Sequence, residues 1–542
     1  MKKLIFVTGG VCSSLGKGIT ASSIGCLLEA RGLTVRMLKV DPYLNVDAGT
    51  MSPYQHGEVY VTDDGAETDL DLGNYARFTN APISRANSVT TGQVYRDVIN
   101  KEREGRFLGR TVQVVPHITD EIKARITAIG KEADVDITII EVGGTVGDIE
   151  SIPFLEAARQ LIHEYGHANA VSVHVTLIPA VTGGELKTKP SQHSVKELQE
   201  VGIQPDVLVC RSDEPLDEAL RRKLAAFTNI DFDGIISAYN VDSIYEVPLV
   251  YQEQGLDSFI LKRMNVESRH ADLKLWQSLV RRIKEPKSRV RIAVVGKYME
   301  LHDAYKSVWE ALHHGGFAHQ AAVDIVPVDS DKLESAQVDF AAVFKDVAGI
   351  LVPGGFGHRG TRGMVDTARW ARETGLPYFG ICLGMQIMAI DWARHILGWA
   401  DADSTEFCQD TPHPVVSLLQ DQINIKNFGG TMRLGRNDTV FVAGSKAALA
   451  YGGNLVSERH RHRYEFTNTY RDDFRKSGIT ITGLTPDEEL VECLEWPNHP
   501  WGVGVQFHPE FKSAPVAPHP LFAAFVKACL DQAKARQTPG SC

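Results

Sequence analysis

The segment GICLGMQ at residues 380–386 places a cysteine between two glycines, at the end of an apolar run. Residues 376–381 predict a strand, and the apolar spacing after Cys382 predicts a helix. This order of strand, tight turn and helix is typical of a nucleophile elbow, where a reactive side chain projects from a strained turn. Gly380 and Gly384 allow strand and helix to approach closely. The segment therefore predicts an α/β fold with Cys382 as a candidate nucleophile.

A second motif, QFHPE at residues 506–510, offers the groups that a cysteine nucleophile needs. His508 follows another apolar run and is placed to take a proton, while Glu510 can orient its ring. The N-terminus of the helix after Cys382 favours a thiolate and supplies N–H groups for an oxyanion. The alternative is an inert core cysteine and an unrelated surface histidine. The elbow context favours the catalytic interpretation.

Length and composition limit the class of protein. The chain has 542 residues, 43% hydrophobic and 23% charged, so we expect about two to four domains. Its formal net charge of −11 argues against a general nucleic-acid binder. The eight cysteines form no CxxC pair, which disfavours a zinc ribbon or a disulfide framework. The apolar run at the N-terminus is too short for a signal peptide, and no stretch approaches a membrane span, so we expect a cytoplasmic protein.

The first half alternates short apolar runs with helical patterns. One such pattern covers residues 19–31 and ends at Gly32. This alternation predicts a mostly parallel sheet with helices on both faces. Strands are expected at residues 4–8, 35–40, 112–115, 137–142, 171–178, 207–210 and 234–238.

A charged helical stretch that ends near Pro286 separates this half from a second series of strands and helices. Further strands are expected near Val290, Ile325, Ile350, Tyr378 and Val503. The expected organisation is a first domain at residues 1–266, a linker at 267–288, a second domain at 289–537 and a flexible tail at 538–542.

The segment GGVCSSLGKGIT at residues 9–20 follows the first predicted strand and opens a helix. Backbone N–H groups of such a loop can hold phosphate oxygens, and Lys17 adds a positive charge. The match to the Walker A pattern is imperfect, because Val11 stands at the first glycine position and Gly18 replaces the hydroxyl residue after Lys17. A magnesium ion would then need other oxygens, for which Asp71 and Glu141 are candidates. A simple glycine-rich turn is the alternative.

Three further patterns carry more than one interpretation. The loop GGELKTKPSQHS at residues 183–194 suits a second polyphosphate or is an ordinary polar loop. The stretch HEYGH at residues 163–167 fits the zinc-protease pattern, but Gly166 predicts that the helix ends there. The run ERHRHRYE at residues 458–465 is an interaction patch, a metal-binding tract or a source of arginines for a substrate carboxylate; its acidic ends disfavour nucleic acid.

Together and in this order, the motifs resemble the CTP synthase family over nearly the whole chain. GGVCSSLGKG, EVGGTVGDIES and KTKPSQHSVKEL resemble its P-loop NTPase-like synthetase (amidoligase) domain. VPGGFGHRG, GICLGMQ, GGTMRLG and QFHPE resemble a class I glutamine amidotransferase domain. The resemblance implies a ligase of pyrimidine biosynthesis, in which ATP phosphorylates the 4-oxygen of UTP. Ammonia, released from L-glutamine in the second domain and channelled internally, then displaces the phosphate to give CTP.

The resemblance also implies site residues. The catalytic triad is Cys382, His508 and Glu510, and Asp71 and Glu141 bind Mg²⁺. ATP contacts are Ser14, Leu15, Gly16, Lys17, Gly18, Ile19, Asp71, Tyr239, Asn240 and Val241, of which Tyr239 and Asn240 differ from the Lys-Asp pair often found there. UTP or CTP contacts are Ser13, Asp148, Ile149, Glu150, Lys187, Thr188, Lys189, Pro190, Ser191, Gln192 and Lys223. Glutamine contacts are Gly355, Leu383, Gly384, Met385, Gln386, Glu406 and Arg463, with Gly355 and Leu383 forming the oxyanion hole.

By the same resemblance, GTP is an allosteric activator, CTP is a feedback inhibitor and the enzyme is a homotetramer built as a dimer of dimers. Two alternatives remain. One is a glutamine-dependent ligase for another acceptor, against which the KTKPSQHS loop and the EVGGTVGDIES segment argue. The other is an ATP-dependent assembly switch or filament protein with a vestigial glutaminase half, against which the intact triad argues.

Overall fold

The protein folds into two compact units. The computed structural model describes residues 2–131, 134–181, 183–335, 337–419 and 431–537, so the expected tail at 538–542 lies outside the described residues. One unit contains Met1–Ala48 and Asp71–Val280, and the other contains Gly49–Leu70 and Arg281–Cys542. Gly49–Leu70 thus packs within the second unit, although the chain on both sides of it belongs to the first. The expected linear domain boundaries do not include this exchange and stay predictions.

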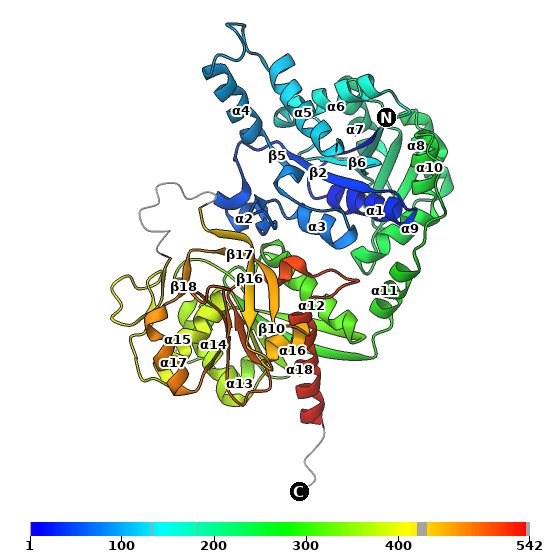
Figure 1. The fold of residues 1–542 in the computed structure, drawn as a ribbon. Helices are drawn as coiled ribbons and strands as arrows, with labels where there is room; N and C mark the ends of the chain where they lie inside the picture. The colour runs from blue at the N-terminus through cyan, green and yellow to red at the C-terminus, as the bar shows by residue number, and fades with distance from the viewer. Residues whose placement is uncertain (1, 132–133, 182, 336, 420–430, 538–542) are drawn as a thin grey trace. The chain divides into compact units, whose positions relative to one another are not determined.

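A parallel sheet forms the centre of the first unit (Figure 1). Over the described residues it has seven strands in the order β5-β2-β6-β1-β7-β8-β9, and every pairing is parallel. The strands are β1 (Lys3–Gly9), β2 (Val35–Asp41), β5 (Ser88–Thr90), β6 (Ile137–Val142), β7 (Ala170–Leu177), β8 (Val207–Ser212) and β9 (Ile235–Tyr239).

Helices cover both faces of this sheet, as the alternation of patterns predicts (Figure 1). Leu4 and Phe6 of β1 share one apolar core with residues of α4, α5 and α6, whereas α1 packs against β1, β2 and β6. The helices of this unit are α1 (Lys17–Ala30), α3 (Asp71–Phe78), α4 (Thr91–Arg103), α5 (Thr119–Gly130), α6 (Ile152–Tyr165), α7 (Lys189–Glu200), α8 (Glu218–Thr228), α9 (Val247–Glu253) and α10 (Leu256–Arg263). Helix α11 (Lys274–Lys284) lies in the charged stretch expected to link the domains.

One predicted strand is wrong. Residues 112–115 form no strand; they lead into the short turn η3 (Val114–Ile118), in which Val115 has an extended backbone and both Val114 and Val115 are exposed. A short run of valines fits an exposed turn as well as a buried strand, and Pro116 has no N–H to donate to a sheet. The other six predicted strands of this half are present, with ends that differ from the prediction by at most two residues.

The second unit contains a larger mixed sheet. Its described strands follow the order β11-β10-β12-β13-β21-β20-β19-β16-β17. The five from β11 to β21 pair in parallel, as predicted, and the four from β20 to β17 continue the sheet antiparallel. The strands are β10 (Ser288–Gly296), β11 (Ala321–Asp329), β12 (Gly349–Val352), β13 (Tyr378–Ile381), β16 (Arg433–Phe441), β17 (Leu455–His462), β19 (Thr480–Leu484), β20 (Val491–Glu495) and β21 (Gly502–Val505). The predicted α/β class is confirmed, and the antiparallel part is an addition.

Successive residues of the central strands face opposite cores of this unit. Ile350 and Val352 belong to the core under α14 and α15, and Leu351 belongs to the core under α12 and α18 (Figure 1). The helices are α2 (Pro53–His56), α12 (Lys306–Ala318), α13 (Phe340–Val343), α14 (Thr361–Thr374), α15 (Leu383–His395), α16 (Lys446–Tyr451), α17 (Arg471–Ser477) and α18 (Pro520–Gln537). A small sheet holds β14 (Asp403–Ser404), β15 (Pro414–Leu418) and β18 (Tyr464–Phe466), and a hairpin holds β3 (Tyr60–Val61) and β4 (Glu67–Thr68).

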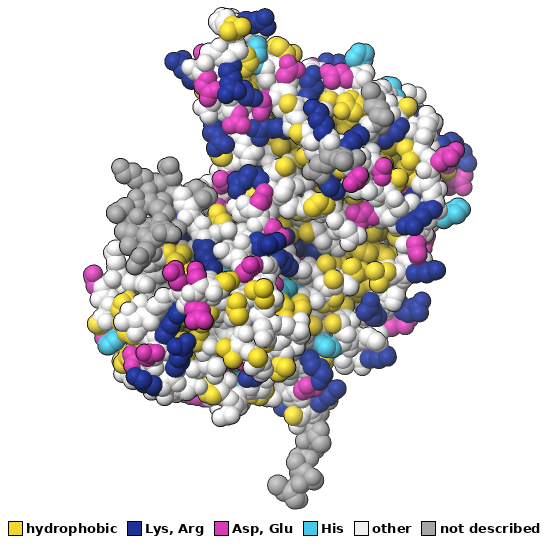
Figure 2. All heavy atoms as spheres, viewed as in Figure 1, with side chains coloured by type: hydrophobic (Ala, Val, Ile, Leu, Met, Phe, Trp, Pro, Cys, Tyr) yellow, Lys and Arg dark blue, Asp and Glu magenta, His cyan; other side chains and the backbone are white. Residues whose placement is uncertain are grey.

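Charged side chains of both signs are intermixed over the face seen in Figure 2. Among the helices that the structure describes, none has the length and apolar character needed to cross a membrane.

The junction of β13 and α15 is packed backbone against backbone. A Cβ at Gly380 would lie 2.5 Å from the backbone carbon and oxygen of Gly384, and a Cβ at Gly384 would lie 2.1 Å from the carbonyl oxygen of Val352. Both glycines are therefore required by close approach, which confirms the prediction made from the elbow.

Gly380→Ala should destabilise the second unit, because the new methyl group meets backbone atoms that cannot rotate away. We expect a loss of about 1–3 kcal/mol, seen as a lower midpoint of thermal unfolding. Gly453→Ala is the matched control, since no atom lies within 4 Å of its Cβ position, and it should change stability by less than about 0.5 kcal/mol. Equal midpoints for the two variants would contradict this account of the junction.

Candidate active sites

Cys382 occupies the turn between β13 and α15. Its backbone has φ 51° and ψ −99°, a left-handed region that is uncommon for a residue with a side chain. It caps the N-terminus of α15, so the helix dipole favours negative charge on its sulfur. The predicted strand, strained turn and helix are thus confirmed.

His508 and Glu510 lie beside this turn and form a buried pair. His508 Nδ1 is 2.7 Å from Glu510 Oε1, and His508 Nε2 makes no hydrogen bond in the part of the chain that the structure describes. Burial lowers the pKa of His508, but the charges of Glu510 and Cys382 outweigh it and raise that pKa to about 10. His508 therefore holds a proton at neutral pH.

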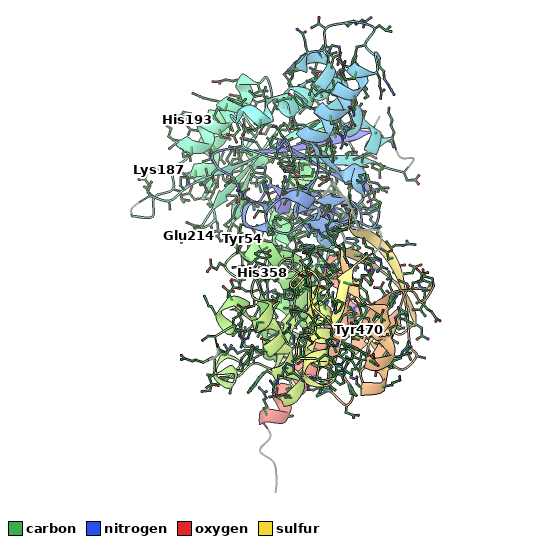
Figure 3. The ribbon with its side chains drawn as sticks, turned by 90° about the vertical axis from the view of Figure 1, so that its left-hand side faces the viewer. Tyr54, Lys187, His193, Glu214, His358 and Tyr470 are labelled. Atoms are coloured by element: carbon green, nitrogen blue, oxygen red, sulfur yellow. The ribbon has the colours of Figure 1, made fainter. Side chains whose placement is uncertain are left out.

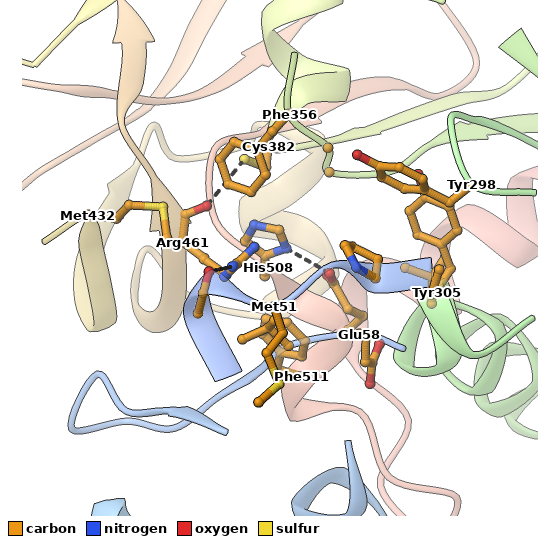
Figure 4. A pocket seen from close by; sticks show the side chains of 18 of the residues that line it. Met51, Glu58, Tyr298, Tyr305, Phe356, Cys382, Met432, Arg461, His508 and Phe511 are labelled. Carbon is orange, nitrogen blue, oxygen red and sulfur yellow. Dashed lines mark hydrogen bonds and ion pairs between the residues drawn. The ribbon is translucent and has the colours of Figure 1, made fainter. Parts of the chain in front are cut away.

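A cavity of about 470 Å³ opens in front of Cys382 (Figure 4). One part of its wall comes from the glutaminase motifs and the other from the start of Gly49–Leu70. The lining residues include Gly354, Gly355, Phe356, Cys382, Arg461, Arg463, His508 and Glu510, together with Gly49, Thr50, Met51, Pro53, Glu58 and Val59.

Ion pairs fix Gly49–Leu70 in the second unit. Arg459 donates to Asp63 over 2.5 Å and to the Tyr60 hydroxyl over 2.7 Å, and Arg461 donates to Glu67 over 2.9 Å. The run ERHRHRYE therefore uses these two arginines to hold the cavity wall. Arg461 and Arg463 both line the cavity, and Arg463 remains a candidate for the substrate carboxylate.

Some of the other residues expected to contact glutamine lie near the cavity, and some are buried in helix α15. Gly355 adjoins Leu383, since a Cβ at Gly355 would lie 3.3 Å from Leu383 Cδ2. Their roles as oxyanion donors stay predictions. Glu406 accepts a hydrogen bond from the Gly357 N–H over 2.6 Å. Met385 and Gln386 are buried inside α15, so their side chains face the core.

The phosphate loop of the first unit has the expected setting between β1 and α1. Val11, Ser14 and Gly16 have positive φ, a backbone conformation that is common in loops whose N–H groups bind anions. Lys17 is buried and its Nζ donates to the Gly144 carbonyl over 2.7 Å.

Asp71 and Glu141 meet beside this loop. Lys39 Nζ lies 3.1 Å from Glu141 Oε1 and also contacts Asp71. A Cβ at Gly18 would lie 2.3 Å from Asp71 Oδ1, and any hydroxyl side chain after Lys17 would collide with this carboxylate. The missing Walker hydroxyl is thus explained: Asp71 approaches the place where it would stand. Two carboxylates next to a phosphate loop fit Mg²⁺, which binds one or two carboxylates plus phosphate oxygens.

Two cavities adjoin the loop. One of about 190 Å³ brings together most of the expected ATP contacts, namely Ser14, Leu15, Gly16, Ile19, Tyr239, Asn240 and Val241, and adds Arg211 and Tyr251. The Asn240 side chain is held by Arg211 and Asp213. A second cavity of about 370 Å³ is lined by Ser13 and by residues 177–180.

The expected UTP contacts are less tightly gathered. Lys187 projects from a loop and His193 lies on the helix that follows it (Figure 3). Lys187 Nζ pairs with Glu185 over 2.6 Å, while Thr188, Ser191 and Gln192 are buried. Asp148, Ile149 and Glu150 belong to the short turn around η4 (Ile149–Ser151), and Ile149 is 82% exposed. The structure does not place these three among the described lining residues of either cavity.

Comparison with known proteins assigns a family to each half of the chain. The family model described as CTP synthase N-terminus matches residues 3–266, and that of glutamine amidotransferase class-I matches residues 300–528. A CTP synthase of Aquifex aeolicus is 54% identical over 532 residues, covering 98% of this chain and 99% of that protein. One of Thermomicrobium roseum is 55% identical over 527 residues, covering 97% and 95%.

The chain belongs to the CTP synthase family. It contains the synthetase and glutamine amidotransferase domains used in the glutamine-dependent conversion of UTP to CTP in pyrimidine biosynthesis. A match over both halves favours this enzyme over a ligase for another acceptor. Among solved structures, the glutaminase domain of Trypanosoma brucei CTPS with bound acivicin is 40% identical, covering 45% of this chain and 94% of that chain, with a TM-score of 0.42.

The zinc-protease interpretation of HEYGH is excluded by the local fold. Helix α6 ends at Tyr165, and Gly166 has φ 77°, so His167 lies outside the helix that carries His163. Across the described residues, no group of three or more His, Cys, Asp or Glu side chains is arranged for a metal ion.

Sequence reasoning missed two lysines. Lys39 lies between the carboxylates of Asp71 and Glu141, and Lys297 donates to the carbonyls of Phe356 and Gly357. Burial lowers the pKa of Lys297 to about 8. Lys39 lies within a predicted apolar strand, in LKVD, and Lys297 directly follows another, in VVGKY. A charged residue at such a place in the sequence could have indicated a buried functional lysine.

Glu510→Gln should move the alkaline limit of glutamine hydrolysis to lower pH. The imidazolium of His508 persists below its pKa, and loss of the Glu510 charge lowers that pKa from about 10 toward the ordinary 6.5. The rate should therefore fall at a pH about two units lower than in the wild type. The measurement is the pH profile of glutamine hydrolysis, with the exposed Glu489→Gln as control. A Glu510→Gln profile that coincides with the control would contradict the assignment.

Proposed function

We propose that this chain makes CTP at two separate sites, through a UTP intermediate phosphorylated on its 4-oxygen. ATP and UTP react in the first unit, and glutamine is hydrolysed in the second. The observation that carries the proposal is the cavity that contains Cys382 and His508 and is also lined by residues leading toward Asp71.

In the proposed glutaminase site, the Cys382 thiolate attacks the amide carbon of glutamine. The N–H groups of Gly355 and Leu383 stabilise the oxyanion, and His508 gives its proton to the leaving ammonia. Water then hydrolyses the thioester to glutamate, with His508 as base. Glu406 and Arg463 are proposed to bind the charged groups of the substrate, because one is acidic and the other is basic. Arg463 lines the cavity, and Glu406 accepts from the N–H of Gly357, which directly follows the lining residue Phe356.

The proposed path of ammonia begins in this cavity. Free ammonia in water would be protonated and lost as a nucleophile, so it must travel inside the protein. Met51, Pro53 and Val59 line the cavity beside Glu58, and the chain continues from there to Asp71. The segment that forms this wall leads directly to Asp71, a residue proposed to bind ATP and Mg²⁺. This supports the transfer of ammonia inside the protein.

In the proposed synthetase site, the loop Ser14 to Ile19 holds the ATP phosphates and Lys17 neutralises part of their charge. Asp71 and Glu141 would hold Mg²⁺, which supplies charge neutralisation to the phosphates when bound. Tyr239, Asn240 and Val241 line the adenine side. The loop at Lys187–Gln192 with Lys223, and Asp148–Glu150, are proposed for UTP and for CTP as inhibitor.

GTP activation is proposed from the family alone, and a homotetramer from the family together with the surface of the first unit. Large apolar side chains exposed on the first unit support self-association; they include Leu44, Leu108, Val114, Val115, Ile149 and Ile152. We also propose a cytoplasmic location, because the cysteines that the structure describes are free thiols, as in a reducing compartment.

Cys382→Ala should abolish CTP formation with glutamine and leave CTP formation with added ammonia active, because only the nitrogen supply is removed. CTP is measured in the presence of UTP, ATP, Mg²⁺ and GTP with either nitrogen source. Cys408→Ala, at an exposed cysteine of the same unit, is the control and should support both reactions. Equal failure of Cys382→Ala with both nitrogen sources would contradict the two-site mechanism.

A further inference from the structure

Gln506 is a fully buried amide beside the sulfur of Cys382. Its side chain is 0% exposed, and its Nε2 donates to Cys382 Sγ over 3.6 Å. The two residues directly follow the neighbouring parallel strands β21 and β13, which are joined by the bond from the Cys382 N–H to the Val505 carbonyl. The sheet itself therefore sets the distance between this amide and the sulfur.

Gln386 determines which end of the Gln506 amide faces the sulfur. Gln386 Nε2 donates to the backbone carbonyl of Tyr464 over 2.9 Å, and this carbonyl can only accept. The same Nε2 lies 3.4 Å from Gln506 Oε1. The Gln506 oxygen must therefore face Gln386, and its N–H groups must face Cys382.

Two buried histidines extend this set of contacts, because His462 contacts the Tyr464 carbonyl and His460 contacts His462. His462 Nδ1 lies 3.1 Å from the Tyr464 oxygen, and His462 Nε2 lies 3.0 Å from His460 Nδ1. Burial lowers the pKa of both histidines well below the ordinary value, so they are neutral and each ring offers one donor and one acceptor. A continuous series of hydrogen bonds thus runs from the interior of the unit to the sulfur.

The remaining surroundings of the sulfur have mixed charge. The titratable and charged side chains that line its cavity are Glu58, Tyr298, Tyr305, Arg461, Arg463, His508 and Glu510. The backbone carbonyl of Arg461 lies 4.0 Å from Sγ and disfavours a negative charge there. The Gln506 N–H opposes this carbonyl, because a hydrogen bond to a charged acceptor is stronger than one to a neutral acceptor.

We propose that Gln506 stabilises the Cys382 thiolate through its side-chain N–H, and that Gln386 is a positioning residue that fixes the direction of the Gln506 amide. This inference rests on the proposed role of Cys382 as the glutaminase nucleophile. Gln386 is also expected to contact glutamine. The inference gives its buried side chain a second role, which is to orient Gln506.

The test is the pH dependence of Cys382 alkylation by iodoacetamide in the full chain, with the Cys382 peptide quantified by mass spectrometry. Gln506→Met keeps the side-chain length and removes the donor, and should raise the midpoint by about one pH unit, a tenfold loss of thiolate below it. Gln386→Met should raise the midpoint less. The double variant should match Gln506→Met, because Gln386 acts through Gln506.

Gln409→Met, at an exposed glutamine of the same unit, is the matched control, and the exposed Cys408 is the internal reference for the reagent. A purely structural role would slow alkylation at every pH or lower the unfolding midpoint without moving the pH midpoint, and this result in Gln506→Met would overturn the proposal. If Gln506→Met does not fold, Gln386→Met decides, and an unchanged pH midpoint in that variant overturns the proposal.

The alkylation needs no substrate, so it is separate from the test of the proposed function. Glutamine hydrolysis by the wild type, and its loss in Cys382→Ala, report on the function. A shifted midpoint without hydrolysis would remove the function and leave the thiolate interaction in place.

Discussion

The close approach of β13 to α15 is the constraint on which the second unit depends. Gly380 and Gly384 allow the backbones of the strand and the helix to touch on either side of the turn. The tight turn between them forces Cys382 into a left-handed conformation. Once the sulfur is fixed there, β21 places Gln506 and His508 beside it, and Glu510 follows two residues later. The proposed chemistry is a consequence of where two glycines permit backbone contact.

A similar use of glycine appears at the other proposed site. Gly18 leaves room for the Asp71 carboxylate next to Lys17, and Lys39 joins Asp71 to Glu141. The loop has lost the usual hydroxyl and gained a carboxylate brought by another part of the chain. In both units a glycine permits close packing next to a charged group. A buried lysine or the N-terminus of a helix lies near that group and stabilises its charge.

Much of the fold followed from periodicity. The parallel strands could be predicted because a strand that is buried on both faces of a sheet is a nearly continuous apolar run in the sequence. The elbow was predictable because its glycines, cysteine and flanking apolar runs are adjacent in sequence. The antiparallel strands β16 and β17 were not, since charged residues such as Arg436 and Arg459 interrupt their apolar pattern. The strand predicted at residues 112–115 failed because the same valines lie exposed before Pro116.

Contacts between distant parts of the chain were beyond the reach of local patterns. Asp63 and Arg459 are 396 residues apart, and nothing near either residue indicates that they pair. The placement of Gly49–Leu70 within the glutaminase unit depends on such pairs. Lys39 and Lys297 were missed for the same reason, because a buried lysine is recognised by its partners in space.

The central claim is that nitrogen released at Cys382 reaches UTP without leaving the protein. The most direct measurement supplies glutamine with an isotopic label on its amide nitrogen, together with an excess of unlabelled ammonium, and determines the label in the CTP formed. The account predicts that the amino group of CTP carries the label of glutamine when little ammonium is present. The labelled fraction should stay high as ammonium rises, until the ammonium is concentrated enough for the synthetase site to use it directly. Label diluted in proportion to the unlabelled ammonium at every concentration would contradict it.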